Sequence, residues 1–599
     1  TIKCMDDIVH HTKENRMKKN ISIFLCLFLC AAMLFAYDNQ QKIYETTSEV
    51  YEAIRLLYIA KGHALPSSTG PWSASELALM ADKINEQGLS SGQKSTYEFI
   101  MAELGSEPVQ LAEGVAMNFD FNANLEGYYH NSKDTAFQGR SNWIYGMMHQ
   151  KPFIALDWET WAAGHFYGFF EFDLMNQIHV NSGEIGSTAF STNIMGFQNL
   201  VFKINDMNFN FPYRAFISGG GAHWSFQIGR DRLNWGAGET GNLFVGDNLL
   251  YHNMARITTF SDVFKYTFVA SFFPHQMNYS GTPWGESKNQ HQVIKGLSMF
   301  MAHRIEGRLF HDKLNITLTE SIMYMNEDGN LDLMVLNPMM FYHNNYIRSM
   351  SNSLLGFEVD WTIVNGLNIY AQAVIDEFAL PGEPIPGKDS KSLPSAYGFL
   401  VGLKGAFSVG NGMLYGSLEG VRTDPFLYLR DKANYSQSKG EYGINYVVAV
   451  RNYSESGVTY DEEFLGYKYG GDALVGNFNV GYKQFGKFHV EGNVFFMAHG
   501  TFDKWTCWSY VGNGDGAYFD NSELQTPTES HPTPNHKGDV SARNSVEYTT
   551  VIGINGGFDF SRLFSAMLQA DYIAIKNFRN IKDARNNDFQ LVVGLSYSI

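Results

Sequence analysis

From Val115 to the end of the chain, apolar and polar residues alternate with a period of two, and this alternation limits the possible folds more than any other feature. In residues 117–126, Met, Phe, Phe, Ala and Leu occupy one face, and Asn, Asp, Asn, Asn and Glu occupy the other. Similar runs occur at residues 166–172 and 264–272. Strict alternation predicts β-strands with one apolar and one polar face. In a soluble protein the apolar face would cover a core, whereas in a membrane barrel it faces lipid.

The strand expected at residues 301–309 helps to decide between these two possibilities. Its apolar residues are Met301, Ile305 and Leu309, and its charged residues are Arg304, Glu306 and Arg308. Three long charged side chains on one face are hard to bury in a dry core but fit a water-filled lumen. We therefore predict a mainly β fold, a large antiparallel transmembrane β-barrel.

Short turn signals separate the predicted strands. Asn365-Gly366 and Asn411-Gly412 are favoured in tight hairpins, and Glu327-Asp328-Gly329 is similar. At typical strand and loop lengths, the chain after Val115 has room for roughly 16 to 20 strands. The alternation continues from Phe589 to Ile599. This ending is similar to the terminal assembly signal of bacterial outer-membrane proteins, which usually ends in Phe or Trp.

Residues 37–113 have helical periodicity instead. Apolar residues at helical spacing predict a helix within Tyr44–Ala60, and another begins after Ser73, which forms a capping-box pattern with Glu76. A third short helix is expected over Gly92–Leu104. We expect these helices to pack on one another in a small periplasmic domain. Docking to a periplasmic partner and plugging of the barrel are the alternatives.

The first 36 residues predict export. Met17 is followed by Lys18-Lys19 and by the apolar run Ile21–Phe35, which is short for a spanning helix but suits a secretory signal peptide. We expect cleavage after Ala36 and regard residues 1–16 as an upstream extension. A lipoprotein that uses Cys30 is the alternative.

The resulting domain organisation has three parts. Residues 1–36 are the extension and signal peptide, residues 37–113 are the periplasmic helical domain, and residues 114–599 are the outer-membrane barrel. No segment after the signal peptide has 18 consecutive apolar residues, so we predict no transmembrane helix.

Composition excludes some classes of function. Residues 1–36 carry five Lys/Arg and three Asp/Glu, so their removal changes the net charge from −17 to −19. This acidity argues against a nucleic-acid partner, because phosphates would be repelled. Cys507 is the single cysteine of the predicted mature chain, so no internal disulfide is expected. Aromatic residues make up 15 % and the mean hydropathy is −0.22, which suits alternating strands better than apolar helices.

The segment Gly236-Ala237-Gly238-Glu239-Thr240-Gly241 matches the dinucleotide fingerprint G-x-G-x-x-G. A strand is expected before it, but residues 242–248 lack the apolar helical stripe of a pyrophosphate-binding unit. We therefore interpret these glycines as turns at a strand end. The chain also lacks H-E-x-x-H, G-x-S-x-G and P-loop signatures, so we predict neither an enzyme nor a cofactor. Residues 512–539 lack the spaced carboxylates of a calcium loop, so no metal site is predicted.

The same region resembles a known family. Gly229–Gly238, with the sequence GRDRLNWGAG, is followed by Gly241-Asn242-Leu243 and by Asp247-Asn248. This order is similar to the G-R-x-x-x-x-W-G-x-G…G-[SN]-L…[SD]-N signature of the Wzi-like capsule-assembly family, with Ala237 where proline is common. Further similar segments follow in the same order, at residues 332–342, 354–361, 370–377, 418–428 and 465–472.

The resemblance implies an outer-membrane β-barrel of about 18 strands behind a periplasmic helical bundle. It further implies a lectin-like protein that binds or anchors capsular or other exported polysaccharide at the cell surface. The implied partners are that polysaccharide, outer-membrane lipid and the barrel-assembly machinery, and we expect a monomer. A porin or substrate channel is the main alternative, because many charged residues lie on predicted lumen faces.

Saccharide recognition needs aromatic faces, carboxylates and amides. This chemistry, applied to the family-like segments, nominates six tentative ligand-binding residues: Arg230, Arg232, Trp235, Asn242, Asp247 and Asn337. Each also has a structural interpretation. The arginines would pair with carboxylates in the lumen, and Trp235 would lie in the aromatic belt at the membrane interface.

Overall fold

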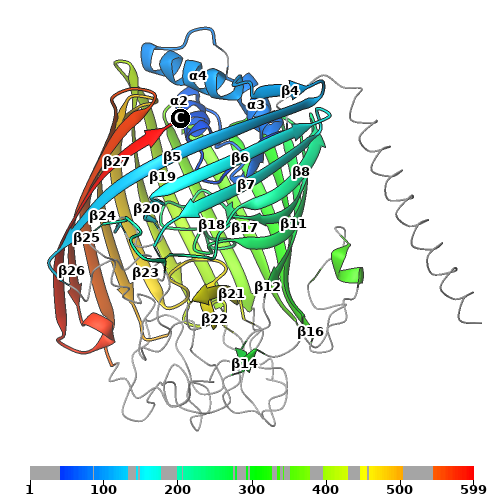
Figure 1. Ribbon diagram of the computed structural model, residues 1–599. Coiled ribbons are helices and arrows are strands. Elements are labelled where there is room, and N and C mark those ends of the chain that lie inside the picture. Colours follow the sequence, from blue (N-terminus) through cyan, green and yellow to red (C-terminus); the bar gives the residue numbers. More distant parts are fainter. Residues whose placement is uncertain are drawn as a thin grey trace, which may run out of the picture.

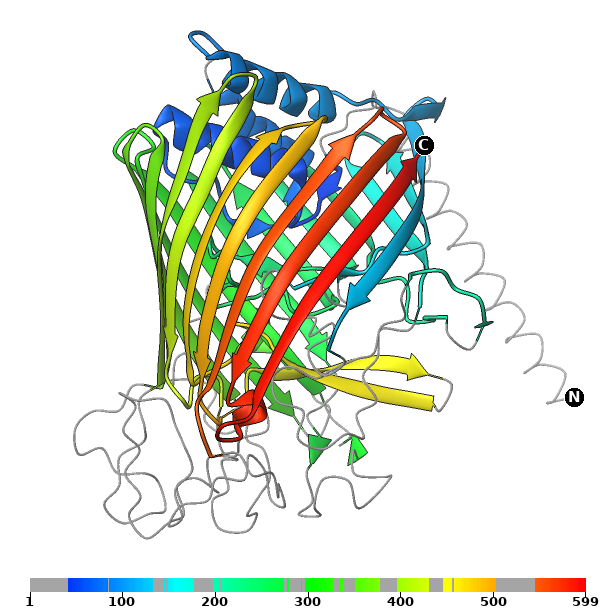
Figure 2. The same cartoon turned by 90° about the vertical axis from the view of Figure 1, so that its left-hand side faces the viewer.

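The computed structural model (Figures 1 and 2) describes residues 41–84, 86–132, 144–145, 149–176, 198–204, 207–273, 277–278, 292–293, 297–326, 333–337, 342, 351–377, 396–429, 445–454, 457–502 and 544–599. The predictions for the signal peptide, the four cysteines, the turn at 327–329 and the segment 512–539 lie outside these residues.

The described residues form a closed barrel of 18 antiparallel strands. Around the wall these are β5 (Val115–His130), β6 (Ile154–Ala162), β7 (Phe166–Leu174), β8 (Ala215–Gly221), β9 (Trp224–Asp231), β11 (His252–Phe260), β12 (Phe264–Phe273), β15 (Leu297–Leu309), β16 (Leu314–Asn326), β17 (Ser351–Val364), β18 (Leu367–Glu377), β19 (Ala396–Val409), β20 (Gly412–Thr423), β23 (Ala473–Gln484), β24 (Phe488–His499), β25 (Glu547–Asp559), β26 (Phe564–Lys576) and β27 (Arg585–Ser598). The last strand, β27, closes on β5 with Leu595 opposite Leu125. The predicted fold class is confirmed.

Several short elements accompany the barrel. The strand β4 (Val109–Ala112) extends the start of β5. Four two-stranded pairs combine β1 (Ile43–Tyr44) with β3 (Trp72–Ser73), β2 (Thr69–Gly70) with β10 (Asn234–Trp235), β13 (Met277–Asn278) with β14 (Gln292–Val293), and β21 (Val447–Ser454) with β22 (Gly457–Phe464). Two 3₁₀ turns are η4 (Leu333–Leu336) and η5 (Phe578–Asn580).

The alternation of the sequence corresponds to the two faces of the wall. On β5, Phe119 and Leu125 are about half exposed on the outside, whereas Asn124 and Glu126 are buried inside. On β15, Ile305 and Leu309 likewise lie outside, opposite Arg304, Glu306 and Arg308. Exposed tryptophans on the outer surface are Trp158, Trp224 and Trp361. An apolar outer surface with exposed aromatic residues fits a lipid environment.

One part of the outer surface is covered by the chain itself. Phe268 and Ala270, expected to face lipid, are buried together with Met301 of β15. They form a cluster with Val335 and Tyr342, which belong to the connection after β16. The lipid-facing prediction is wrong for Phe268, Ala270 and Met301, because a segment of the connection packs against the outside of the wall.

The two ends of the barrel differ in their connections. At the end that carries the helices, turns of two to four residues join strands, as at residues 365–366, 410–411 and 310–313. The connections at the opposite end, such as 175–214 and 424–472, are much longer. The C-terminus lies at the helical end (Figure 2). Asn365-Gly366 forms the predicted hairpin turn, whereas the next predicted turn is displaced by one residue, to Gly410-Asn411.

The N-terminal segment forms the three predicted helices: α2 (Glu49–Lys61), α3 (Ala74–Asp82) and α4 (Ser91–Leu104). The Ser73 hydroxyl caps α3 by accepting the Glu76 amide at 3.3 Å. The side chain of Glu76 does not complete the capping box; it pairs with Lys265 of β12 instead. Within the described residues, none of the helices is both long and apolar enough to cross a membrane.

The helices pack on one another and against the end of the barrel (Figure 1). The Gly366 amide of the β17–β18 turn donates to the Ile59 carbonyl at 2.7 Å. Lys83 pairs with Asp312 at 2.9 Å. Buried residues of α2 belong to the same hydrophobic cluster as luminal residues of the wall. The expected packing of the helices on one another is confirmed, and the helices also pack onto the end of the barrel, as in the plugging alternative.

Candidate functional site

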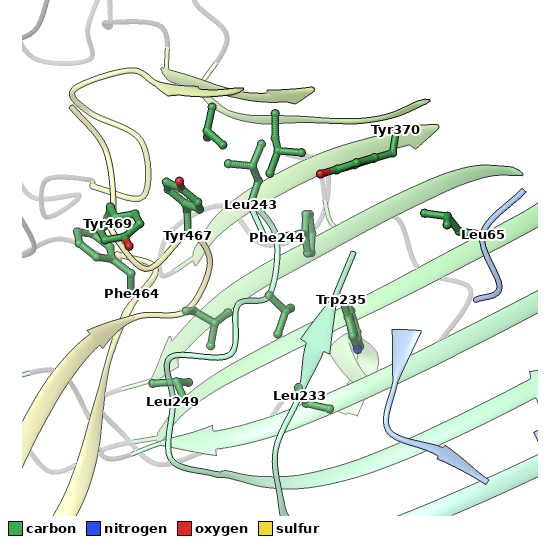
Figure 3. Packing of buried hydrophobic residues seen from close by; sticks show 14 of the residues in the cluster. Leu65, Leu233, Trp235, Leu243, Phe244, Leu249, Tyr370, Phe464, Tyr467 and Tyr469 are labelled. Carbon is green, nitrogen blue, oxygen red and sulfur yellow. The ribbon is translucent and has the colours of Figure 1, made fainter. Parts of the chain in front are cut away.

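The stretch that carries the family-like signature leaves the wall after β9 and folds into the barrel. We call residues 232–251, which join β9 to β11, the luminal loop. Within it, Trp235 pairs with Val245 through a 3.0 Å backbone hydrogen bond. The Gly236 amide donates to the Ser68 carbonyl at 3.1 Å, which joins the loop to the N-terminal segment. Figure 3 shows its apolar side chains, Trp235, Leu243 and Phe244 among them, inside the barrel.

The glycine-rich turn of the luminal loop holds a carboxylate of the protein itself. Glu419 of β20 accepts the backbone amides of Glu239 and Thr240 at 2.8 and 2.9 Å. It also accepts the Thr240 hydroxyl at 2.5 Å and the Tyr370 hydroxyl at 2.7 Å. Two amides that a bound phosphate would use are thus occupied by an internal anion. The interpretation of this motif as a structural turn agrees with this geometry.

Glu239, a carboxylate of the glycine-rich turn itself, joins the helices to the barrel wall. Glu239 accepts a hydrogen bond from Arg55 of α2 at 3.2 Å and pairs with Lys404 of β19. Burial alone would raise the pKa of Glu239, but the charges of Lys404 and Arg55 outweigh it and lower the pKa to about 2. One side chain therefore links α2, the luminal loop and the barrel wall.

The charged face of β15 meets the N-terminal segment. The Arg304 guanidinium donates to Glu358 of β17 at 3.0 Å and to the Thr69 hydroxyl at 2.6 Å. The nearby Trp235 indole donates to the Gly70 carbonyl at 3.2 Å. Arg308 also donates to the Ala64 carbonyl, at 2.8 Å. The predicted luminal orientation of these charges is correct. Their partners belong to the N-terminal segment as well as to the barrel wall.

The far side of the luminal loop is covered by the connection between β20 and β23. The Tyr428 hydroxyl donates to the Leu243 carbonyl and accepts the Tyr467 amide at 3.1 Å. The Gly246 amide donates to the Leu465 carbonyl at 2.9 Å. In Figure 3, Phe464, Tyr467 and Tyr469 lie beside the loop. The described chain therefore fills the interior from both ends.

Two of the nominated residues are structural. Trp235 and Asn242 have no exposed surface. The Asn242 side chain accepts the Gly238 amide at 2.8 Å and the Gln372 side-chain amide at 2.6 Å, and it donates to Asn234 at 2.6 Å. Neither residue can contact a saccharide in this arrangement. The placement of Trp235 in an interfacial belt is wrong, because the luminal loop carries it into the interior.

The two nominated arginines have different surroundings. Arg230 lies on the outward face of β9, where its guanidinium is 3.9 Å from the centre of the Tyr251 ring. Arg232 donates to the Leu250 carbonyl at 3.4 Å. The Arg232 charge also acts on the luminal carboxylates Glu171 and Asp173, in line with its structural interpretation. The two side chains therefore do not form one binding cluster.

The remaining two candidates are exposed and belong to different places. Asp247 is on the luminal loop, and Asn337 follows η4 in the segment outside the wall. Asp247 lies within electrostatic reach of His149, as does Lys468. His149 is exposed, and Lys468 is partly exposed. These three residues, which we call the luminal-mouth cluster, bring together the carboxylate, imidazole and ammonium groups that polar ligands bind.

Sequence reasoning did not nominate His149 or Lys468. Lys468 lies in the family-like segment 465–472, which was the one available signal, whereas nothing local distinguishes His149. Tyr145 and Tyr469 add aromatic rings, their centres 5.8 Å from the His149 ring and 5.5 Å from the Lys468 amine, respectively. In the part of the chain that the structure describes, no group of three His, Cys, Asp or Glu side chains could hold a metal ion.

Comparisons with known proteins support the fold. No family model matches the chain, and no curated protein matches its sequence. Among solved structures, it is similar to Wzi of Escherichia coli, an outer-membrane protein that is involved in group 1 capsule assembly and is a carbohydrate-binding β-barrel. The TM-score is 0.51 at 14 % identity, over 92 % of this chain and 98 % of that one. At this identity the likeness shows the barrel fold alone.

Weaker matches are outer-membrane proteins as well. The outer-membrane channel DcaP of Acinetobacter baumannii has a TM-score of 0.33 and 9 % identity, over 82 % of this chain and 99 % of that one. OccD3 of Pseudomonas aeruginosa has a TM-score of 0.37 and 10 % identity, over 82 % and 95 %. These scores carry no argument about function.

Proposed function

We propose that this protein is a plugged outer-membrane barrel that binds or anchors capsular or other exported polysaccharide at the cell surface, without catalysing a reaction. The observation that carries the proposal is the filled interior. The helices occupy one end of the barrel. The luminal loop, together with the 464–472 segment, occupies the interior toward the opposite end. Such a barrel presents a binding surface rather than a wide aqueous path.

The proposed orientation follows from the two ends of the barrel. Outer-membrane barrels have short turns in the periplasm and longer loops outside. The short turns and helices would then face the periplasm, and the luminal-mouth cluster would face the exterior. Insertion by the barrel-assembly machinery, after export by a signal peptide, is part of the same proposal.

The luminal-mouth cluster offers suitable chemistry for a glycan. Carboxylate and ammonium groups form hydrogen bonds with sugar hydroxyls, and Lys468 can also pair with a uronate or phosphate substituent. Tyr145 and Tyr469 are buried beside the cluster, so they can support His149 and Lys468 from within. The barrel fold shared with Wzi, which is a carbohydrate-binding β-barrel, supports this choice.

Gene deletion tests the cellular role. In a polysaccharide-producing strain, deletion should lower the ratio of surface-bound to shed polysaccharide, and the wild-type gene should restore it. An unchanged ratio, with an intact envelope, would refute the proposal.

Binding by the purified protein tests the cluster itself. The variants D247N and K468M should weaken binding of the purified strain polysaccharide at least fivefold, since each loses a charge-assisted contact. Matched controls are D559N and K487M, which alter exposed residues at the helical end. Equal losses in both pairs would place the binding site elsewhere.

The rival function, a porin or substrate channel, makes an opposite prediction. A plugged barrel should show little steady conductance in planar bilayers. A variant that lacks residues 41–112 should conduct more, because it loses the helices that occupy one end. A large, stable conductance of the intact protein would favour the channel.

A further inference from the structure

The barrel wall is lower on one side. The neighbouring strands β6, β7, β8, β9 and β11 have 9, 9, 7, 8 and 9 residues, whereas β5 has 16 and β15 has 13. At about 3.3 Å per residue and a tilt of about 40°, the short strands rise only roughly 18 to 23 Å along the barrel axis. The apolar band of an outer-membrane barrel is about 25 Å tall. The short strands therefore end within the lipid-facing zone, on the side away from the helices.

A cavity of about 920 Å³ lies at the edge of this low wall. Ile228 and Phe272, both exposed on the outer surface, line it together with the inward-facing Met254 and Phe273. Residues 209–212, from the connection before β8, form another side. We call this cavity the wall recess. Its lining is mainly apolar and continues the lipid-facing surface.

Arg230 is the cationic residue that lines the wall recess within the described chain. It donates from Nε to the Asn253 side chain at 3.3 Å and from Nη1 to the Pro212 carbonyl at 2.8 Å. Its guanidinium stacks over the Tyr251 ring. Among the described residues, no carboxylate lies within 4.0 Å of this guanidinium, unlike the paired luminal arginines.

An arginine without a carboxylate partner is unfavourable on a lipid-facing surface unless an anion reaches it. Within the described chain, Arg230 is held in place by neutral acceptors, so none of these residues compensates its positive charge. A guanidinium matches the geometry of a phosphate, and the apolar residues beside it suit acyl chains. The occupant therefore has to combine a phosphate with a hydrocarbon tail.

We propose that the wall recess binds a phosphorylated lipid of the outer leaflet, with Arg230 against the phosphate and Ile228 and Phe272 against the acyl chains. Continuity with the lipid-facing surface and the uncompensated charge of Arg230 select this occupant. The inference rests on placement in the outer membrane and on the proposed orientation, and it does not depend on polysaccharide binding. It moves Arg230 from the predicted saccharide site to a lipid site.

Lipid binding by the purified full chain tests the proposal. In detergent micelles, native mass spectrometry measures retention of bisphosphorylated lipid A, with dephosphorylated lipid A and inorganic phosphate as separate probes. The wild-type protein should bind the bisphosphorylated form about tenfold more tightly than the dephosphorylated form, as expected for one charge-assisted contact. This comparison needs no variant, so it is independent of folding defects.

The variant R230Q should lose about tenfold in affinity for bisphosphorylated lipid A. The variant R230K should lose less, because lysine keeps the positive charge although it lacks the planar guanidinium. The control R562Q removes an exposed arginine at the helical end and should bind like the wild type. Heat-modifiable gel migration confirms that each variant forms a barrel. Equal binding by R230Q and R562Q would overturn the proposal. Equal binding of both lipid A forms, or displacement by equimolar inorganic phosphate, would also overturn it.

Discussion

The carboxylate of Glu419 accepts both the backbone amide of Thr240, at 2.9 Å, and its hydroxyl, at 2.5 Å, although the two residues are 179 positions apart. Through this contact, a strand of the barrel wall fixes the glycine-rich turn of the luminal loop. The turn then holds Glu239 between Arg55 and Lys404. The packing of the luminal loop depends on this chain of contacts.

Replacing Glu419 by alanine should lower the free energy of unfolding by about 3–5 kcal/mol, because buried donors lose a charged acceptor. The measurement is urea unfolding in detergent, followed by tryptophan fluorescence. Glu107→Ala, at an exposed position, is the matched control and should change stability by less than about 0.5 kcal/mol. Similar losses in both variants would show that the internal anion does not hold the loop.

Gly236→Ala should disrupt the luminal loop. Gly236 has φ of 132°, and an added Cβ would overlap the side chains of Gln372 and Asn242. Strain and overpacking together should cost about 2–4 kcal/mol. Gly88→Ala is the control: Gly88 has φ of 77°, but its Cβ would meet open space. Comparing the unfolding midpoints of the two variants isolates the packing contribution, and equal shifts would contradict a tightly packed loop.

The link between Glu239 and its cations should weaken in acid. The pKa of Glu239 is lowered to about 2 in the folded protein from its ordinary value of 4.5. Its stabilising contribution is therefore complete above about pH 4.5 and is lost as the pH falls toward 2, with a total on the order of 3 kcal/mol. Thermal unfolding of the wild type and E239Q between pH 6 and 2 measures it. The difference between the two proteins should shrink across this window, and a constant difference would contradict the assigned pairing.

Arg304 and Glu358 should be strongly coupled. Arg304→Met leaves Glu358 buried without its partner and should cost about 3–5 kcal/mol. The double variant R304M/E358M removes both charges and should be more stable than R304M. A double-mutant cycle from urea unfolding gives the coupling energy, expected to exceed about 1 kcal/mol. Additive effects of the two single substitutions would contradict the bidentate pair.

Local patterns in the sequence were sufficient for the wall and the helices. The alternation in β5 and β15 predicted which side chains face outward, because each strand residue faces either lipid or the interior. Helical spacing predicted α2 and α3 for the same local reason. The turn Asn365-Gly366 was also predictable, since tight hairpins need residues that accept a positive φ. Phe268, Ala270 and Met301 were the exceptions, because they are covered by Val335 and Tyr342, which lie in a different connection.

The candidate site was less predictable. The family-like signature drew attention to the luminal loop, but it did not show which way each side chain of the loop points. Trp235 and Asn242 are buried by the wall and the N-terminal segment, whereas Asp247 and Lys468 each lie within electrostatic reach of His149, from three different connections. These neighbours are set by how the connections fold into the barrel, which residue spacing does not encode.

By itself, the sequence determined a barrel with an apolar outer face, its N-terminal helices and the structural nature of the glycine-rich turn. Only the tertiary structure decided that the interior is filled, that Arg230 faces outward into the wall recess, and that Arg232 lies near luminal carboxylates. The physical reason is one of range. Alternation and helical spacing reflect the environment of each residue along one element, whereas the filling of the lumen depends on contacts such as Glu419–Thr240, which join distant segments.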